Sequence, residues 1–356
     1  MRQNSSSRYQ SSVKSLFLVL AAASLAGCAT VAWYGQAARG QIEVLAKRED
    51  IADLIADPAT DPALRSRLET VLEMRRFAVE ALGLPDGRSY TLYADLERDA
   101  PLWNVVATPA HSVEPRTWCY PLVGCLAYRG FFERRGATRL ADRLAGQGLD
   151  AAVFPATAYS TLGWFADPVL DSMLRLSDAD LAELIFHELT HERLYVAGDT
   201  AFNEAYATFV GRLGAARWLS STGHDAALAA WRRDQRLDQG LRDLLLETRR
   251  RLSEGFETAA DESAAARLKT REFERLRRRI GELARSHDSA ALEAWLERPL
   301  NNAHLALVAT YEAGVGAFER LFHEECGEEL RCLHERAAAL ARAGAPARRA
   351  FLESGH

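Results

Sequence analysis

The chain has 356 residues, of which 48% are hydrophobic and 26% are charged, and its formal net charge is −5 at pH 7. These values are ordinary for a folded globular protein, and the acidic balance gives no reason to expect a nucleic-acid partner. Beyond the first 28 residues no segment is apolar enough to cross a membrane. The remaining chain, about 330 residues long, suffices for one large or two moderate domains.

The first 28 residues predict an export signal that is not part of the fold. Basic residues precede a short apolar run at residues 16–25, which is too short to span a bilayer comfortably. The run ends in Leu25-Ala26-Gly27-Cys28, which resembles a bacterial lipobox. That resemblance implies that Cys28 is lipidated and becomes the mature N-terminus, and Ala29 after it implies transfer to the outer membrane. An ordinary cleaved signal peptide and an uncleaved anchor are the alternatives.

The next predicted elements are helical and then β-rich. Residues 41–82 predict two helices, separated near Asp57-Pro58 and Asp61-Pro62, because proline restricts helix continuation. From residue 89 the chain changes to short β-forming segments around a helix at residues 138–146. The segments lie at residues 90–93, 103–107, 112–119, 126–132 and 151–154. They predict a small, mostly antiparallel sheet.

Four cysteines remain after Cys28, an even number in a chain with an export signal, and this favours disulfides. They form two groups in which five residues separate the cysteines. We expect the local pairing, Cys119 with Cys125 and Cys326 with Cys332, among three possible connectivities. A metal site made of these cysteines is the alternative, and the lack of a C-x-x-C spacing disfavours it.

A helix with metal-ligand spacing is predicted after the sheet. Ser177 and Asp180 match a capping box, and apolar residues follow at helical spacing. The helix contains His187-Glu188-Leu189-Thr190-His191, in which the two histidines are four residues apart and therefore lie on one face. Glu188 stands beside the first histidine, where its carboxylate reaches a metal-bound water rather than the metal.

A second helix is predicted to start at Asp199 or Thr200 and to run to Leu219. The short link makes the two helices neighbours, and an antiparallel arrangement is expected. Glu204, about one turn into the second helix, then approaches the histidines. Ligation by His187, His191 and Glu204 would leave a fourth position open to water, as in catalytic zinc sites.

The sequence H-E-L-T-H followed by Asn203-Glu204-Ala205 resembles the gluzincin metallopeptidases. Most of the mature chain, particularly residues 159–168 and the lipoprotein start, is similar to a family of predicted bacterial lipoprotein aminopeptidases. The resemblance implies one zinc ion, a peptide substrate, and a sheet edge that binds the substrate backbone. Residues 158–163 are a candidate for the lip of that cleft, and the alternative is that Tyr159, Trp164 and Phe165 are core residues. The spacer before Glu204 is shorter than in well-known gluzincins. Thr208 replaces the Asp that often orients a histidine there.

The chain after residue 220 is predicted to be helical. Long charged helices at residues 226–251 and 264–284 precede a short one at residues 290–297 and a last one running from Asn301 through Phe318. Zinc peptidases need a donor to the oxyanion of the tetrahedral intermediate. Tyr311 is the first candidate and His304 the second, while Asn301 and Asn302 are candidates for binding the substrate backbone.

These observations predict an α+β fold, mainly helical, with a small, mostly antiparallel sheet that precedes the paired metal helices. The expected division is a signal at 1–28, a helical segment at 29–85, the metallopeptidase core at 86–220 and a helical region that closes the cleft at 221–356. The predicted function is that of a membrane-anchored zinc peptidase facing the periplasm, with aminopeptidase activity favoured. A zinc endopeptidase and a low-turnover outer-membrane interaction lipoprotein are the alternatives. The carboxylate that would bind the substrate amine stays open among Glu133, Glu192 and Glu312.

Overall fold

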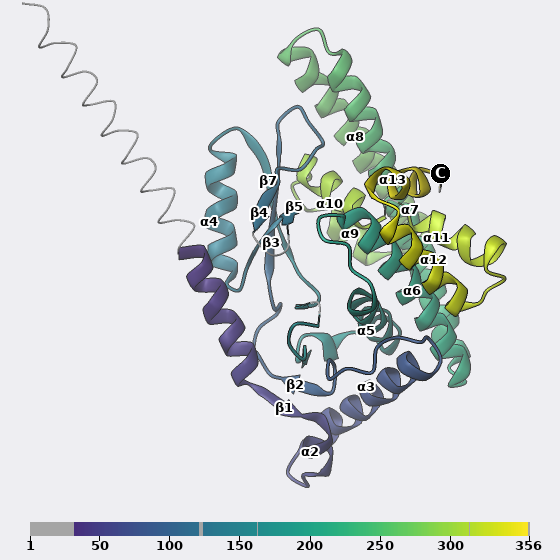
Figure 1. The fold of residues 1–356 in the computed structure, drawn as a ribbon. Coiled ribbons are helices and arrows are strands. Elements are labelled where there is room, and N and C mark those ends of the chain that lie inside the picture. Colours follow the sequence, from purple (N-terminus) through teal and green to yellow (C-terminus); the bar gives the residue numbers. More distant parts are fainter. Residues whose placement is uncertain (1–31, 121–123, 162, 313, 355–356) are drawn as a thin grey trace, which may run out of the picture. The chain divides into compact units, whose positions relative to one another are not determined.

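The computed structural model describes residues 32–120, 124–161, 163–312 and 314–354, and the side chains of residues 309–312 lie outside this description. The chain divides into two compact units, Met1–Ala46 and Lys47–His356. In the first unit, residues 32–46 form a helix (Figure 1). Cys28 and the predicted export signal lie outside the described residues. Within the described ranges, no helix combines the length and apolar character that crossing a membrane requires.

The largest β element in the second unit is a three-stranded antiparallel sheet in the order β6 (Arg129–Phe131), β3 (Trp103–Pro109) and β7 (Leu149–Pro155). Helix α4 (Arg134–Ala145) covers one face, where its alanines and Leu144 pack against Val105 and Ala107 of β3 (Figure 1). On the other face, Val106 packs against Ala303 and Ala306 of α10 (Asn302–Glu312). Both faces of β3 are therefore buried, since successive strand residues point to opposite sides.

Two smaller sheets complete the β structure of the described residues. In the first, β2 (Leu92–Ala94) pairs antiparallel with β1 (Arg48–Asp50) and parallel with β8 (Val169–Leu170). The second is a hairpin of β4 (Trp118–Tyr120) and β5 (Gly124–Leu126), in which Cys119 and Cys125 are directly opposite and form a disulfide. The predicted small antiparallel sheet is thus three separate sheets, and one strand pair is parallel.

The first helices of the second unit follow the predicted break. Helix α2 (Ile51–Ala56) ends before Asp57, and α3 (Pro62–Glu80) begins after Asp61. The carboxylate of Asp61 accepts hydrogen bonds from the backbone N–H groups of Ala63 and Leu64, both at 3.0 Å. Proline at the first position of α3 loses no hydrogen bond, because that N–H has no partner within a helix.

Helices make up most of the remaining chain. They are η1 (Met173–Arg175), α5 (Asp178–Arg193), α6 (Thr200–Ser221), α7 (Asp225–Thr258), α8 (Glu262–His287), α9 (Ala290–Leu296), α10, α11 (Val315–Arg320), η2 (Leu321–Glu325), α12 (Leu330–Arg342) and α13 (Ala345–Glu353). The long helices α7 and α8 pack side by side around a core that includes Leu252, Leu276 and Ile280 (Figure 1). The prediction of a mainly helical α+β fold is confirmed.

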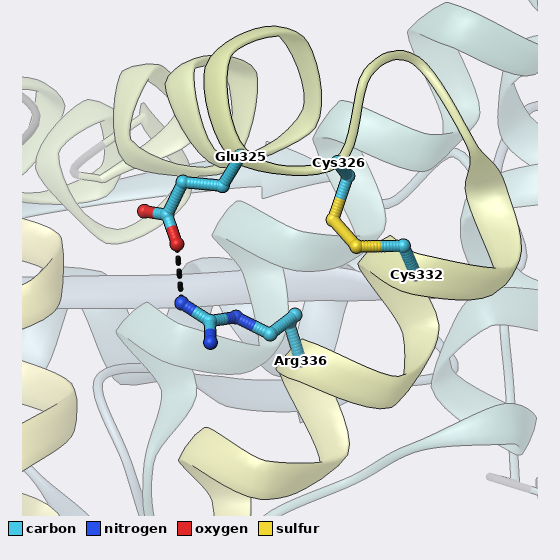
Figure 2. The surroundings of a disulfide bond; sticks show 4 residues. All are labelled: Glu325, Cys326, Cys332 and Arg336. Atoms are coloured by element: carbon cyan, nitrogen blue, oxygen red, sulfur yellow. Dashed lines mark hydrogen bonds and ion pairs between the residues drawn. A yellow bond between two sulfur atoms is a disulfide. The ribbon is translucent and has the colours of Figure 1, made fainter.

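The C-terminal helices differ from the prediction at one point. The single last helix expected through Phe318 is two helices, because Gly314 adopts a φ of +93° between α10 and α11. Residues with a side chain rarely adopt this left-handed backbone conformation, whereas glycine does so readily. Further along, the Cys326–Cys332 disulfide joins η2 to α12, and Arg336 pairs with Glu325 beside it (Figure 2). Both predicted disulfide pairings are confirmed.

Candidate metal centre

Helix α5 presents two histidines on one face. Its start matches the predicted capping box, since Ser177 Oγ accepts a hydrogen bond from Asp180 N at 3.1 Å and donates one to Asp180 Oδ2 at 2.7 Å. The helix continues through His187 and His191, whose Nε2 atoms are 3.1 Å apart. Four-residue spacing on a helix produces this convergence, as predicted.

The start of helix α6 is held by side chains from two directions. Asp199 caps it by accepting a hydrogen bond from Phe202 N at 3.3 Å, and Arg348 of α13 donates to the same carboxylate at 2.6 Å. Asn203 exchanges two hydrogen bonds of 2.8 Å with the backbone N–H and C=O of Val196. The link between α5 and α6 is therefore ordered, and this order determines where Glu204 lies.

Two glycines on α6 allow the helices to approach closely. A Cβ atom at Gly211 would lie 2.8 Å from the carbonyl oxygen of Glu183 and 3.1 Å from Cβ of His187. At Gly214 it would lie 2.7 Å from Cδ2 of Phe186. Asn203 at the start of α6 bonds Val196, just beyond the end of α5, whereas Gly211 further along α6 lies against Glu183 and His187, so the two helices are antiparallel, as predicted. Sequence reasoning missed these glycines, although two small residues three positions apart indicate close helix packing.

The three predicted ligands converge on one point. Oε2 of Glu204 is 3.2 Å from Nε2 of His187 and 3.6 Å from Nε2 of His191. This oxygen is buried and accepts no well-aligned hydrogen bond. A buried acceptor of this kind is costly unless a cation or a donor satisfies it, so the residues fit a bound metal ion. His187, His191 and Glu204 are also a group of described residues with the spacing required to hold one.

The electrostatics of the triad formed by His187, His191 and Glu204 favour a negatively charged Glu204. Burial alone would raise the pKa of this carboxyl, but the adjacent imidazoles of His187 and His191 outweigh burial and lower the pKa to about 2. Burial opposes protonation of His187, yet the carboxylates of Glu204, Glu188 and Glu183 raise the pKa of its imidazole. The surplus of carboxylates means that this centre attracts cations.

A cavity of about 680 Å³ opens over the triad. Glu188 lines it together with His187, His191 and Glu204, so the predicted base and the predicted ligands face one space. One group of lining residues is apolar: Leu102, Leu126, Phe154 and Leu307. A second group is charged and comes from α5, α6 and α7: Asp180, Glu183, Arg212, Asp238 and Arg242. A further wall is formed by Pro155, the last residue of the edge strand β7, and by residues 156–160 after it.

Two tyrosines line this cavity that sequence reasoning did not identify. Tyr128 lies between β5 and β6, and Tyr195 lies just after α5, with its ring 6.1 Å from that of His191. The pKa of both hydroxyls is raised, mainly by burial and to a smaller extent by the negative charge of Glu204. Both are therefore protonated hydrogen-bond donors at neutral pH. The position of Tyr195 four residues after His191 was a usable signal, whereas Tyr128 reaches the site only through the tertiary fold.

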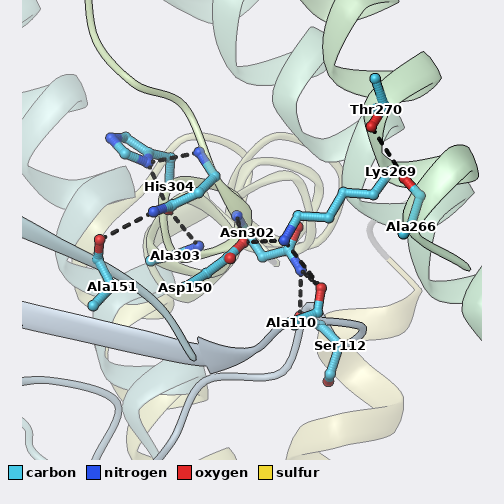
Figure 3. A network of polar contacts seen from close by, with 11 residues as sticks. Ala110, Ser112, Asp150, Ala151, Ala266, Lys269, Thr270, Asn302, Ala303 and His304 are labelled. Carbon is cyan, nitrogen blue, oxygen red and sulfur yellow. Dashed lines mark hydrogen bonds and ion pairs between the residues drawn. The ribbon is translucent and has the colours of Figure 1, made fainter. Parts of the chain in front are cut away.

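The polar residues expected to bind substrate lie elsewhere (Figure 3). Asn301 donates to the carbonyl of Ala151 at 3.0 Å, and Asn302 donates to the carbonyls of Ala110 and Ser112 at 3.1 and 2.9 Å. Asp150 accepts hydrogen bonds from Asn302 N at 2.9 Å and from Lys269 Nζ at 2.6 Å. This network joins α10 and α8 to the sheet and its loop. Asn301 and Asn302 do not line the cavity.

The two candidates for the oxyanion donor differ in position. His304 hydrogen-bonds Asn301 at 3.0 Å and packs its ring 5.1 Å from that of Phe154, outside the cavity wall. Burial lowers its pKa to about 4. The side chain of Tyr311 lies outside the described residues, although its backbone is in α10, one turn after the cavity-lining Leu307.

Two of the candidate amine-binding carboxylates, Glu133 and Glu192, do not line the cavity either. Glu133, which precedes α4 in the chain, is exposed to solvent. The side chain of Glu192 lies against Gly163 and Gly87 and hydrogen-bonds Ser89. The side chain of Glu312 lies outside the described residues. The acidic residues that do line the cavity, apart from Glu188 and Glu204, are Asp180, Glu183 and Asp238. The orienting partner of His191 stays unassigned, because its Nδ1 is buried without a hydrogen bond among the residues described.

The arrangement defines a class of protein, a mainly helical α+β chain whose paired helices bring two imidazoles and a carboxylate to one cavity. The chain belongs to the family described as "Putative aminopeptidase", whose model matches residues 32–352. That span includes the triad, Glu188 and both tyrosines. No curated protein and no solved structure matches the chain significantly. Membership of this family supports a peptidase-like function with a peptide as the substrate.

Proposed function

We propose that the protein is a zinc-dependent peptidase that acts as an aminopeptidase. The observation that carries this proposal is the convergence of His187, His191 and Glu204 beside Glu188 in a single cavity. Such a set of two imidazoles and one carboxylate is typical of catalytic zinc sites, which keep one coordination position for water or substrate.

The distances between the ligand atoms support zinc as the metal. With metal–ligand distances of 2.0–2.1 Å and tetrahedral angles, ligand atoms are about 3.3 Å apart. The three separations in this chain are 3.1, 3.2 and 3.6 Å, with a mean of 3.3 Å. Calcium and magnesium prefer sites made entirely of oxygen ligands, which disfavours them at a site with two imidazoles.

The chain supplies groups for each proton transfer. A zinc ion held by the triad would polarise the scissile carbonyl and lower the pKa of a water molecule. The carboxylate of Glu188 takes a proton from the attacking water and delivers it to the nitrogen of the leaving amine. The protonated hydroxyls of Tyr128 and Tyr195 donate hydrogen bonds to the developing oxyanion. Tyr311 stays a candidate for the same role on the sequence argument alone.

The cavity also offers a carboxylate for the free amine of an aminopeptidase substrate. Glu183 lies one turn before His187 on α5, so both face the cavity. Gln235 of α7 donates to it at 2.7 Å, and Arg212 of α6 lies 3.4 Å away. Burial raises the pKa of the Glu183 carboxyl, and the nearby charge of Arg212 only partly offsets this rise. A cationic amine would stabilise a carboxylate in this position, so Glu183 takes the place of Glu133 and Glu192, and Glu312 stays a candidate on the sequence argument alone.

We also propose that a lipid on Cys28 anchors the protein to the outer membrane, facing the periplasm. The lipobox-like residues 25–28 support this location, and so do two disulfides, which persist in oxidising compartments. Mass spectrometry of the mature N-terminus tests the anchor. A diacylglyceryl-modified Cys28 is expected, and an unmodified terminus at another residue would contradict it.

The activity is tested with the purified, zinc-loaded chain, an aminoacyl-arylamide and N-acetylated peptides. Wild type should hydrolyse only substrates with a free amine, and Glu188→Gln should bind one zinc ion while losing turnover by a factor on the order of 10³. Normal turnover by Glu188→Gln would refute the proton-transfer role. Equal hydrolysis of acetylated peptides would make the protein an endopeptidase instead.

A further inference from the structure

Two neighbouring aromatic side chains are exposed to solvent. Among the described residues of Lys47–His356, Trp164 and Phe165 are the exposed large hydrophobic side chains, with 72% and 46% of their surface accessible. Single exposed apolar residues are common on protein surfaces, but adjacent large aromatics point to an interaction site. We call Trp164 and Phe165 the aromatic tip.

The backbone that carries the aromatic tip is ordered by a buried carboxylate. Asp167, only 2% exposed, accepts hydrogen bonds from Thr161 N and Thr161 Oγ1, both at 2.7 Å, and from Ser160 Oγ at 3.3 Å. Thr161 in turn accepts hydrogen bonds of 3.1 Å from the backbone N–H groups of Trp164 and Phe165. These hydrogen bonds restrain the backbone of the described loop residues, and such restraint reduces the entropy lost on binding.

The loop that carries the aromatic tip forms part of the wall of the cavity over His187, His191 and Glu204. Tyr159 and Ser160, immediately before the tight turn, line the cavity. On its other side the loop packs on helix α5, where Gly163 lies against Glu192. Gly163 has a φ of +77°. A Cβ atom there would lie 3.5 Å from Cγ of Glu192. Ser160 lines the cavity, and its neighbour Thr161 accepts the hydrogen bond of Trp164 N at 3.1 Å, so the tip stands at the rim of the cavity.

We propose that the aromatic tip binds the part of a peptide substrate that extends beyond the cavity and that it favours apolar side chains. This inference rests on the proposed peptidase function and adds a preference for longer, apolar substrates. A cavity of about 680 Å³ has the volume of a small-molecule site, so a longer peptide must cross its rim. The indole and phenyl faces gain free energy when an apolar side chain displaces water from them.

Binding is tested in the inactive Glu188→Gln full-length chain, so that no peptide is consumed. Two octapeptides with a free amine are compared, one with leucine and one with serine at its third to sixth positions. Adding Trp164→Ser and Phe165→Ser should raise the Kd for the leucine peptide about tenfold and leave the Kd for the serine peptide unchanged. The control pair Arg232→Ser and Arg233→Ser, exposed on α7, should change neither value.

Kinetics separate this inference from the proposed function. In the active chain, the same tip variant should raise KM for the leucine octapeptide and leave hydrolysis of a short aminoacyl-arylamide unchanged. An unchanged Kd for the leucine peptide, or an equal loss with both substrates, would overturn the inference. If the wild-type chain hydrolyses nothing, the proposed function fails, while the binding comparison still reports on the tip.

A bilayer is the rival occupant of the aromatic tip, since tryptophan also favours membrane interfaces. Vesicles of phosphatidylethanolamine and phosphatidylglycerol are mixed with the full chain carrying Cys28→Ser, which removes the predicted lipid. Loss of vesicle binding in the tip variant, with unchanged peptide Kd, would overturn the peptide assignment and assign the tip to the membrane.

Discussion

Replacing Gly211 by alanine tests how closely the candidate metal site depends on the packing of its two helices. The new Cβ atom would lie 2.8 Å from the carbonyl oxygen of Glu183, 3.1 Å from Cβ of His187 and 3.3 Å from its backbone nitrogen. An ordinary contact starts at 3.4 Å, so α5 and α6 must separate by about 0.6 Å (3.4 − 2.8). Because the contacted atoms belong to the backbone or lie next to it, no side-chain rotation relieves the overlap.

Two consequences of Gly211→Ala have predictable magnitudes. Overpacking costs about 1–3 kcal/mol, and the better helix propensity of alanine offsets up to about 1 kcal/mol of this. The apo chain should therefore lose about 1–2 kcal/mol of stability. Metal sites tolerate ligand displacements of about 0.2 Å, so a 0.6 Å separation should weaken zinc binding about 10- to 100-fold.

Urea denaturation of the apo chain and zinc competition with a chromophoric chelator measure the two effects of Gly211→Ala. Gly240→Ala on α7 is the matched control, because its Cβ atom would meet only the side-chain methyl groups of Leu283, at 3.3 and 3.4 Å. That variant should keep its zinc affinity and lose no stability. Wild-type zinc affinity in Gly211→Ala would refute the reasoning that close helix packing positions the ligands.

Three further predictions concern a ligand, a buried histidine and a disulfide. Glu204→Gln should weaken zinc binding by at least about tenfold with little change in the apo fold, and unchanged zinc stoichiometry and affinity would remove Glu204 from the ligands. Burial lowers the pKa of His334, which bonds Tyr206 and the carbonyl of Leu82, to about 4. Between pH 6.5 and 4 the unfolded chain binds this proton and the folded chain does not, so stability should fall by roughly 3 kcal/mol as pH drops through that window. In His334→Gln the pH dependence of urea midpoints should flatten, and an identical slope would contradict this assignment. Replacing Cys326 and Cys332 by serine should cost about 2 kcal/mol, since their loop is short, and an unchanged melting temperature would be inconsistent with it.

Features that depend on near neighbours in the chain could be predicted from the sequence. The capping box at Ser177, the four-residue spacing of His187 and His191, and the early position of Glu204 on the next helix are all local. Helix geometry and a short link convert them directly into three ligand atoms that lie within 4.8 Å of one another. Both disulfides were predictable for the same reason, because each joins cysteines six residues apart.

The assignment of polar residues far from the metal helices failed because it required knowledge of long-range contacts. Asn301 and Asn302 have the chemistry to bind a peptide backbone, yet the backbone that they bind is that of the protein itself, at Ala151, Ala110 and Ser112. A side-chain amide satisfies any nearby carbonyl, and sequence spacing does not indicate which carbonyl will be nearby.

The sequence by itself determined the metal-ligand pattern, the helices that carry it, the cysteine pairs and the mainly helical α+β class, since each follows from periodicity, caps or short spacing. Only the tertiary structure decided what surrounds the triad: the tyrosine hydroxyls of Tyr128 and Tyr195, the carboxylate of Glu183 and the close approach at Gly211. Those groups come together through packing between segments distant in the chain. The free energy of such packing depends on the shape of the whole fold rather than on any local pattern.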